Sequence, residues 1–562
     1  HLYNKCQKRG YMDNSIKPYT VEKYTFRSLL EKVEVSYKER VAYSTYLDEN
    51  GNITYFELKE RAEKISSYLI SLGLNKEDKV AIFSPSSPNW MVAYLGIVNI
   101  SLVAVPILSD FSSRESSAIL EESNVSVIFT NDKNYKKIEE TTQKKAIKVI
   151  DIFTLVPYGE EECILSTSIN KNEIEKRTPE EGTIASLIFT SGTTGRSKGV
   201  VLTHKNLIYS ADEASLPYMK IKKGYRVLSI LPMSHVYEFT LGHVLPLMMG
   251  CHITVLCKTP SSAILLPAFK RVKPHIVMTV PLIIEKIYKS FVKPILENSK
   301  IKVLTKTKLG KRVVYSFIVR KLLSYLGGEV KFFGIGGAPL DKETEEFLYY
   351  GSFPYALGYG LTETSPLISA CGPKRRQHSL NKIGKLVKGL DVKILEPNSS
   401  GIGEIVLKGP SVMSGYYNND KLNSQSFTND GYFKTGDLGC IDERGFIAIR
   451  GRSKTMILSS SGENIYPEEI EELINKRKYV EESLVVEHSG SLTALIKLDL
   501  NALKDKLKIA KEDVLTEAKK YLEEIKKEVN KELSSFSRIS DVVIQEKSFE
   551  RTPTMKIKRF LY

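Results

Sequence analysis

A string of glycine and hydroxyl residues, TSGTTGRSKG, runs from Thr190 to Gly199 directly after the apolar run SLIF. Its glycines let backbone amides approach an anion closely, and Lys198 adds positive charge. The string therefore predicts a phosphate-binding loop, although an exposed turn without a ligand is the alternative. It is not a Walker loop, because Lys198 comes three residues after Gly195 and no Ser or Thr follows it. The candidate phosphate-binding residues are Thr190, Ser191, Gly192, Thr193, Thr194, Gly195 and Lys198.

The string resembles the signature of the adenylate-forming superfamily, which contains acyl-CoA synthetases, peptide-synthetase adenylation domains and luciferases. The resemblance extends from about Tyr24 to Tyr562, and further strings follow in the family's order. One of them, GGAP, resembles the family's loop beside adenine. Its residues are Gly336, Gly337, Ala338 and Pro339.

The string GYGLTETSP, from Gly358 to Pro366, resembles the family's nucleotide motif. The resemblance implies that Tyr359 stacks on adenine and that Thr362 contacts phosphate. It also implies that Glu363 and Thr190 hold Mg²⁺. An aromatic face suits adenine, and a carboxylate suits a hard cation that bridges phosphates. The nucleotide-binding residues of this string are Gly358, Tyr359, Gly360, Thr362 and Glu363.

Three more positions match motifs of the family. YFKTGDL resembles the ribose motif, which implies that Asp437 accepts hydrogen bonds from both ribose hydroxyls. Arg452 matches an arginine that contacts ribose and phosphate, and Lys454 matches the hinge of the small domain. The string GENIYPEEIE resembles a loop that swings to the acyl-adenylate and lines the entry tunnel of the thiol, which implies that role for Gly462 and Glu463.

The end of the chain, RTPTMKIKR, resembles the motif that carries the family's adenylation lysine. Alignment on Thr552 and Pro553 implies that this lysine is Lys556. Met555 stands where the family usually has glycine, which leaves Lys558 as the alternative.

The string LPMSHVYEFT occupies the substrate-side segment of the family. His235 matches a position beside the carboxylate, and a histidine satisfied within the core is the alternative. Tyr237 and Glu238 are candidates for the wall of the acyl tunnel. LPMSHVYE and TPTMKIKR most resemble bacterial long-chain fatty-acid–CoA ligases.

The resemblance implies an enzyme that uses ATP and Mg²⁺ to convert a fatty acid into acyl-AMP and then transfers the acyl group to coenzyme A. Alternatives are an acyl carrier protein as the acceptor, an aryl or other acid as the substrate, a luciferase-like oxygenase and a non-catalytic homologue. Acyl chain length and oligomeric state, including a homodimer, stay open. Lys374, Arg375 and Arg376 are candidates for carrier-protein docking or for coenzyme A phosphates, with a solvated loop as the alternative. The implied catalytic residues are Lys556, Glu363, Thr190 and His235.

The elements that must position these strings are short β-branched runs, such as SVIFTND and SLIFTSG, alternating with helical patterns. This alternation predicts an α/β fold with ligands beyond the carboxyl ends of the strands. Residues 383–449 are rich in glycine and turns, which predicts antiparallel β structure. We predict a large domain of parallel and mixed sheets with a β subdomain over residues 1–451. A small mobile α+β domain is predicted over residues 452–562.

Composition sets further limits on the 562-residue chain. Its net charge is +15, which we assign mainly to solvated helix faces such as Lys504 to Lys531, and we expect no nucleic-acid binding. Six scattered cysteines without a C-x-x-C pair argue against a disulfide framework or a zinc site and fit a reducing cytoplasm.

Membrane contact is a separate question for the sequence. The stretch from Val92 to Leu108 is short for a membrane span and predicts a buried helix followed by a buried strand. The first twenty residues lack the apolar core of a signal peptide. Whether residues 1–11 belong to the natural protein stays open. We expect a cytoplasmic enzyme and carry peripheral contact with the inner face of the membrane, through basic helices, as a hypothesis.

Overall fold

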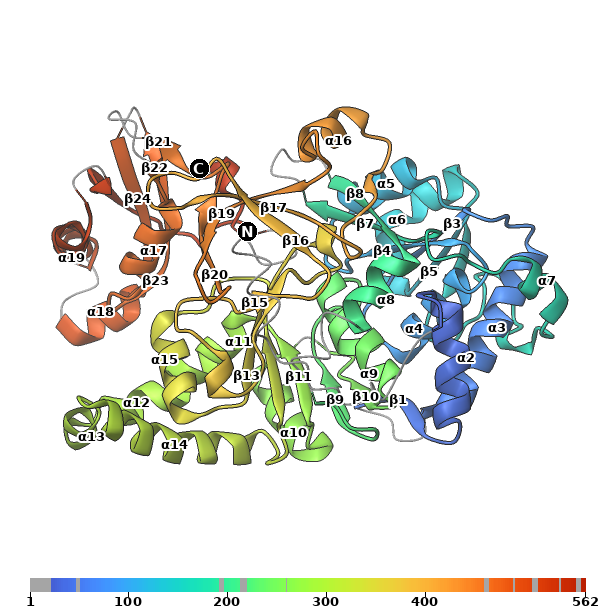
Figure 1. Cartoon of the computed structure of the whole chain (residues 1–562), viewed down its shortest axis with the longest axis horizontal. Coiled ribbons are helices and arrows are strands. Elements are labelled where there is room, and N and C mark those ends of the chain that lie inside the picture. Colours follow the sequence, from blue (N-terminus) through green and yellow to red (C-terminus); the bar gives the residue numbers. More distant parts are fainter. Residues whose placement is uncertain are drawn as a thin grey trace.

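The computed structural model describes residues 22–46, 51–191, 197–212, 220–258, 260–458, 464–488, 491–507, 514–534, 537–551 and 557–562. Two large sheets lie side by side, a third antiparallel sheet packs across them, and a smaller α+β unit follows at the C-terminal end (Figure 1). The predicted α/β class is confirmed. The predicted division between residues 451 and 452 stays a prediction.

The first large sheet has seven strands in the order β18-β8-β7-β4-β3-β5-β6. Strands from β7 to β6 are parallel, whereas β8 and β18 add antiparallel pairs. Successive residues of β3 face opposite sides: Val80 and Ile82 pack with α3 (Tyr55–Ser71) and α4, and Ala81 and Phe83 with α5 and α6. Bounds are β3 Lys79–Phe83, α4 Pro88–Val98, β4 Val103–Ile107, α5 Ser113–Ser123, β5 Val127–Thr130, α6 Asp132–Lys144, β6 Lys148–Asp151, α7 Lys171–Lys176, β7 Ile184–Ser191, β8 Ser197–Thr203 and β18 Gly415–Tyr416.

The second large sheet has nine strands in the order β15-β14-β13-β12-β11-β9-β10-β1-β2. Strands β13 to β1 are parallel, and the strands at both edges are antiparallel. Bounds are β1 Val41–Thr45, β2 Ile53–Thr54, β9 Arg226–Ser229, β10 His252–Val255, α10 Ser262–Val272, β11 Ile276–Thr279, α11 Pro281–Ile287, η3 Tyr288–Val292, α12 Lys293–Leu296, α13 Ser299–Leu304, α14 Lys308–Tyr325, β12 Phe332–Ile335, α15 Lys342–Gly351, β13 Tyr355–Tyr359, η4 Thr362–Thr364, β14 Ser369–Ala370, η5 Arg375–Gln377 and β15 Lys385–Leu386.

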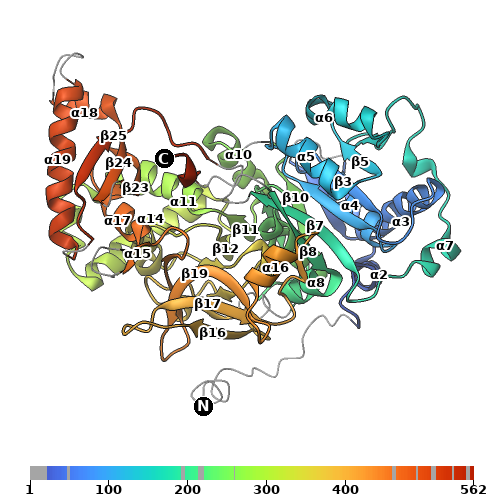
Figure 2. The same ribbon diagram turned by 90° about the horizontal axis from the view of Figure 1, so that it is seen from above.

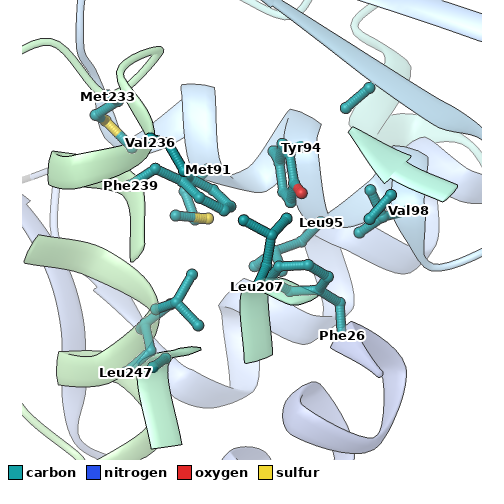
Figure 3. Close-up of a cluster of buried hydrophobic side chains, with 14 of the residues drawn as sticks. Phe26, Met91, Tyr94, Leu95, Val98, Leu207, Met233, Val236, Phe239 and Leu247 are labelled. Carbon is teal, nitrogen blue, oxygen red and sulfur yellow. The ribbon is translucent and has the colours of Figure 1, made fainter. Parts of the chain in front are cut away.

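The core between the two large sheets anchors the LPMSHVYEF segment (Figure 3). Met233, Val236 and Phe239 point into this core, where the Phe239 ring lies 4.5 Å from that of Tyr94. The predicted buried helix and strand within Val92–Leu108 are confirmed as the end of α4 and β4. Elements around this core include α2 Phe26–Tyr37, α3 Tyr55–Ser71, α8 His204–Asp212, the π-helix η2 Glu238–Val244 and α9 Leu245–Met248.

The third sheet confirms the antiparallel prediction, with β16, β17, β19 and β20 in that order. In the C-terminal unit, α19 packs beside a three-stranded sheet of β23, β24 and β25 (Figure 2). No helix in the described part of the chain is long and apolar enough to cross a membrane. Bounds are β16 Asp391–Leu395, β17 Gly403–Lys408, α16 Asp420–Ser426, β19 Phe433–Ile441, β20 Ile447–Arg452, β21 Ile457–Leu458, β22 Asn464–Ile465, α17 Pro467–Asn475, β23 Val480–His488, β24 Ser491–Leu498, α18 Leu500–Leu507, α19 Val514–Glu532 and β25 Asp541–Ile544.

Candidate active site

A continuous cleft of about 4310 Å³ runs along the carboxyl ends of strands from both large sheets. Its wall includes Thr190 at the end of β7, Gly336 after β12 and Tyr359 at the end of β13. The cleft continues between the third sheet and the C-terminal unit. This is the place where α/β sheets bind ligands, and the structure brings most of the predicted site residues to it.

Glu363 and Lys198 lie at one part of this cleft, joined through a residue that the sequence strings did not contain. The hydroxyl of Tyr416 donates a hydrogen bond of 2.8 Å to Glu363 Oε1, and Lys198 Nζ lies 5.4 Å from the centre of the Tyr416 ring. Pairing of β18 with β8 sets Tyr416 opposite Val200 and so brings it near Lys198. The side chains form a polar cluster beside Thr190, which is the cross-strand neighbour of Lys198.

The charges around Lys198 suit an anionic ligand. Partial burial lowers the pKa of the Lys198 ammonium group, the nearby Lys454 charge lowers it further, and Glu363 opposes both effects. Two ammonium groups in one cleft repel each other, and a polyphosphate would relieve that repulsion. A single carboxylate with a threonine hydroxyl nearby is the donor set on which Mg²⁺ binds together with phosphate oxygens and water. Thr190 and Glu363 therefore fit the predicted cation.

Asp437, Tyr359 and Arg452 form a second cluster. The Tyr359 hydroxyl donates a 2.8 Å hydrogen bond to Asp437 Oδ2, and Arg452 Nε lies 3.0 Å from Asp437 Oδ1. The pairing of β19 with β20 sets Asp437 directly opposite Arg452. Only 3% of Asp437 is exposed, so its carboxylate has a fixed direction. The ribose and adenine residues predicted from separate strings thus lie together.

Glycines of the predicted nucleotide strings allow close backbone packing. A Cβ atom on Gly360 would lie 1.6 Å from the carbonyl oxygen of Pro366. On Gly336 it would lie 3.2 Å from the Tyr237 ring, which joins the GGAP loop to the substrate-side segment. Gly337, Ala338, Pro339, Gly358 and Thr362 also line the cleft.

The substrate-side segment presents His235, Tyr237 and Glu238 to the cleft. His235 is half-buried, and its Nδ1 accepts a hydrogen bond from the Tyr237 amide at 3.3 Å. The Tyr237 hydroxyl lies 3.8 Å from the Met278 sulfur, and burial raises the pKa of Tyr237 well above its usual value. Tyr237 thus contributes a mainly apolar surface to the wall.

Glu238 is buried in a hydrogen-bonded chain that the sequence did not reveal. The Ser229 hydroxyl donates to Glu238 Oε1 at 2.6 Å and lies 3.0 Å from His243 Nε2. The other nitrogen of His243 lies 2.9 Å from the Tyr43 hydroxyl. Each group is satisfied when the Tyr43 hydroxyl donates to His243 Nδ1 and His243 Nε2–H donates to the Ser229 hydroxyl. Glu238 Oε2 has no hydrogen-bond partner of ordinary geometry in the described part of the chain.

Burial determines the protonation of this chain. It raises the pKa of Glu238 to about 8, against the Ser229 hydrogen bond and the Leu231 amide, which favour the anion. It lowers the pKa of His243 to about 3. Both side chains are therefore mainly neutral near pH 7, and Glu238 is a buried carboxylic acid at the cleft wall.

Several predicted residues lie outside the described residues: Gly192, Thr193, Thr194, Gly195, Gly462, Glu463 and Lys556. The ranges flanking them are described. Thr190 and Lys198 pair across the β7–β8 hairpin, and β21 pairs with β22 across residues 459–463. Lys558 is described, and its ammonium group lies 3.9 Å from the Glu550 carboxylate.

Among the described residues, two ion pairs connect the C-terminal unit to the rest of the chain. Lys342 of α15 lies 2.8 Å from Glu472 of α17, and Arg450 of β20 lies 3.5 Å from Glu469. Both pairs are partly exposed, so each contributes little stability alone. The two pairs favour this orientation of the unit beside the cleft only weakly, so the unit can leave it.

Comparison with known proteins identifies the family. Residues 30–417 match the family described as AMP-binding enzyme, and residues 454–561 match the AMP-binding enzyme C-terminal domain. The chain belongs to the AMP-binding enzyme family. It is therefore an enzyme, and the resemblance drawn from the sequence is confirmed.

Known members extend this finding. The chain is 28% identical over 551 residues to long-chain-fatty-acid–CoA ligase FadD15 of Mycobacterium bovis, covering 90% of each protein. It is 27% identical to the chloroplastic long-chain-fatty-acid–[acyl-carrier-protein] ligase AEE15 of Arabidopsis thaliana, covering 95% of this chain and 84% of that protein. The fold is similar to O-succinylbenzoate coenzyme A synthetase from Bacillus subtilis in complex with AMP. The TM-score is 0.73 at 23% identity, covering 95% of this chain and 97% of that chain.

Proposed function

We propose that this AMP-binding enzyme activates a fatty acid in two steps and that its preferred substrate is a long-chain acid. A carboxylate oxygen attacks the α-phosphorus of ATP, the bond to the β-phosphate breaks, and acyl-AMP and pyrophosphate form. The thiol sulfur of coenzyme A then attacks the acyl carbon, the bond to AMP breaks, and the thiol proton is lost to solvent. The observation that carries the proposal is one cleft that holds the Lys198–Glu363 and Asp437–Arg452 clusters beside a largely apolar wall.

The residues of the cleft have distinct parts in this proposal. Asp437 and Tyr359 bind the nucleoside, and Lys198 with Thr190 binds the phosphates. Mg²⁺ on Glu363 and Thr190 would neutralise phosphate charge. Lys556 approaches the carboxylate and the α-phosphate, where negative charges meet, so its charge stabilises the transition state most. His235, Tyr237 and Glu238 line the acyl side.

The second step needs a different arrangement of the small domain. We infer that this domain turns about Lys454, which removes Lys556 and brings the segment of Gly462 and Glu463 to the acyl-adenylate. The partly exposed pairs Lys342–Glu472 and Arg450–Glu469 are weak enough to break during that turn. Such a conformational step often limits turnover.

An acyl carrier protein is the second candidate acceptor. The relative AEE15 is named as a long-chain-fatty-acid–[acyl-carrier-protein] ligase, and the net charge of +15 would attract an acidic partner. Lys374, Arg375 and Arg376 lie in and beside the short helix η5, although Arg375 also rests over the Tyr349 ring at 5.7 Å. We also propose that the enzyme contacts a membrane peripherally and that it forms a homodimer.

The test is exchange of labelled pyrophosphate into ATP, without any thiol, across short, medium and long fatty acids and aryl acids. Exchange that is greatest with long-chain acids supports the proposal. Exchange with aryl acids alone would contradict the proposed substrate. Acyl transfer to coenzyme A and to holo acyl carrier protein is then compared at equal acyl-AMP concentration.

A further inference from the structure

Residues 298–328 form a basic segment that contains no acidic residue. It supplies eight cationic side chains to a protein whose net charge is +15. The segment includes the short helix α13 and the long helix α14, which lie along the lower edge of the molecule in Figure 1. The cations are Lys300, Lys302, Lys306, Lys308, Lys311, Arg312, Arg320 and Lys321.

The same helices expose large apolar side chains. Leu309, Val313 and Phe317 are spaced by four residues and so share one side of α14, opposite the buried side that includes Ile318 and Leu322. Together with Val303 and Leu304, they are 58% to 72% exposed. We call these five residues, together with Lys300, Lys302, Lys306, Lys308, Arg312 and Arg320, the basic–apolar face. Among the large hydrophobic residues elsewhere in the described part of the chain, only Val35 is exposed to this degree.

Most cations of this segment are not neutralised by the protein, and two of the eight turn toward neighbouring elements. Lys311 pairs with Glu346 at 2.6 Å, and Lys321 lies 5.8 Å from the centre of the Phe291 ring. The remaining six have no acidic partner within 4.0 Å among the described residues: Lys300, Lys302, Lys306, Lys308, Arg312 and Arg320. The face therefore combines unpaired positive charge with exposed apolar area.

The opposite side of α14 forms part of the cleft wall. Leu322, Tyr325 and Leu326 line the cleft together with Phe291 of η3. Leu266 and Leu282, which also line the cleft, are about two-fifths exposed to solvent. One helix thus separates the basic–apolar face from apolar surface that is continuous with the proposed acyl site.

We propose that the basic–apolar face binds the surface of an anionic phospholipid bilayer, so that a fatty acid passes from the bilayer into the cleft beside α14. Helices that present apolar residues flanked by lysine and arginine insert at the boundary between headgroups and acyl chains. The cations add attraction to anionic lipid, and an exposed apolar patch of this kind otherwise favours aggregation. The route into the cleft rests on the proposed fatty-acid activity, whereas binding to the bilayer does not.

The test is co-sedimentation of the full chain with vesicles of phosphatidylcholine alone or with 30% phosphatidylglycerol, a probe composition of about one anionic lipid in three. We expect binding only to the anionic vesicles and a decrease with added salt. Val313→Ser with Phe317→Ser, and separately Arg312→Gln with Arg320→Gln, should each lower the partition coefficient about tenfold or more. Wild-type protein that ignores anionic vesicles would overturn the proposal.

Matched controls address the same chemistry elsewhere on the surface. Val35→Ser removes an equally exposed apolar side chain from α2, and Lys519→Gln with Lys527→Gln removes two exposed cations from α19. Both control variants should leave vesicle binding unchanged. An equal loss of vesicle binding in the controls would contradict the assignment of the basic–apolar face as the bilayer-binding surface. The assignment would also be contradicted if the α14 variants lost carrier-protein binding while they kept vesicle binding.

Activity separates this proposal from the proposed function. With a water-soluble medium-chain acid, all variants should retain pyrophosphate exchange, because α14 does not contact the nucleotide cluster. With a long-chain acid delivered in anionic vesicles, the α14 variants should lose most of their rate. If the wild-type protein showed no pyrophosphate exchange with any acid but still bound vesicles, the proposed fatty-acid activation would be contradicted. The assignment of the basic–apolar face to bilayer binding would still be supported.

Discussion

Asp437 and Arg452 face each other across β19 and β20, and Arg452 Nε lies 3.0 Å from Asp437 Oδ1. The ion pair is asymmetric, because Asp437 is buried whereas Arg452 is about half exposed on its side chain. Ribose hydroxyls would therefore meet a carboxylate that is already oriented, and the arginine can shift toward phosphate without unfolding its strand.

Asp437→Asn should weaken ATP binding by at least about tenfold, because charge-assisted hydrogen bonds contribute about 1.5–3 kcal/mol. Isothermal titration with ATP measures this. Asp430→Asn is the control, because it removes an exposed carboxylate that pairs with Lys393 at 3.0 Å and does not line the cleft. Equal affinity in wild type and Asp437→Asn would contradict the assignment of Asp437.

Tyr416→Phe should raise the Mg²⁺ concentration needed for half-maximal pyrophosphate exchange by roughly three- to tenfold, because Glu363 loses the hydrogen bond that orients it. The ring that faces Lys198 remains. Tyr417→Phe removes the neighbouring hydroxyl and should leave the Mg²⁺ dependence unchanged. A Mg²⁺ dependence identical in all three proteins would show that Tyr416 does not position Glu363.

Glu238→Gln should flatten part of the pH dependence of stability. The folded protein keeps the Glu238 proton up to about pH 8, whereas the unfolded chain loses it near pH 4.5. The folded state therefore binds more protons, and the contribution of Glu238 to stability decreases as pH rises from 4.5 to about 8. The variant should gain stability relative to wild type across that window, on the order of a few kcal/mol at its upper end. Urea unfolding at a series of pH values measures the difference, and a constant difference would contradict the buried neutral acid.

Lys556→Ala should nearly abolish acyl-AMP formation and spare thioester formation from supplied acyl-AMP, because only the first step brings carboxylate and phosphate charges together. The two half-reactions are measured separately with a long-chain acid. Lys558→Ala is the matched control two residues away. Equal loss of both half-reactions in Lys556→Ala would refute the assignment, and a selective loss in Lys558→Ala would transfer it to that residue.

Glu469→Gln with Glu472→Gln removes the two ion pairs that join the C-terminal unit to the rest of the chain among the described residues, and also the Glu472–Lys476 pair at the end of α17. The ratio of the two half-reaction rates should change by about two- to fivefold, because each exposed pair contributes up to about 1 kcal/mol to one orientation only. Glu517→Gln, which breaks a surface pair with Lys520 inside α19, should leave the ratio unchanged. Rates that fall by the same factor would mean that the pairs serve stability and not domain orientation.

Sequence strings predicted much of the site because each string carries its own chemistry. The parallel runs predicted the sheets, and the ribose and nucleotide strings contained Asp437, Arg452, Tyr359 and Glu363. Tyr416 was missed because it reaches Glu363 through the β18–β8 pairing, which no local pattern reveals.

Long-range packing accounts for the other differences. Ser229 and His243 contact Glu238 only after β9 and the π-helix η2 pack together. The basic segment at residues 298–328 was not singled out, because a helical pattern does not show which apolar face stays uncovered. Exposure of Phe317 and Val313 required the positions of neighbouring helices.

Strand β20 ends at Arg452, and Lys454 follows two residues later. The amide of Ser453, between them, donates a 2.9 Å hydrogen bond to the Gly436 carbonyl, next to Asp437. The residue that neutralises the ribose carboxylate and the proposed pivot are therefore part of one short stretch of backbone. A nucleotide that draws Arg452 away from Asp437 would shift the backbone beside Lys454. Binding of the nucleotide would therefore be coupled to the orientation of the small domain through residues 452–454.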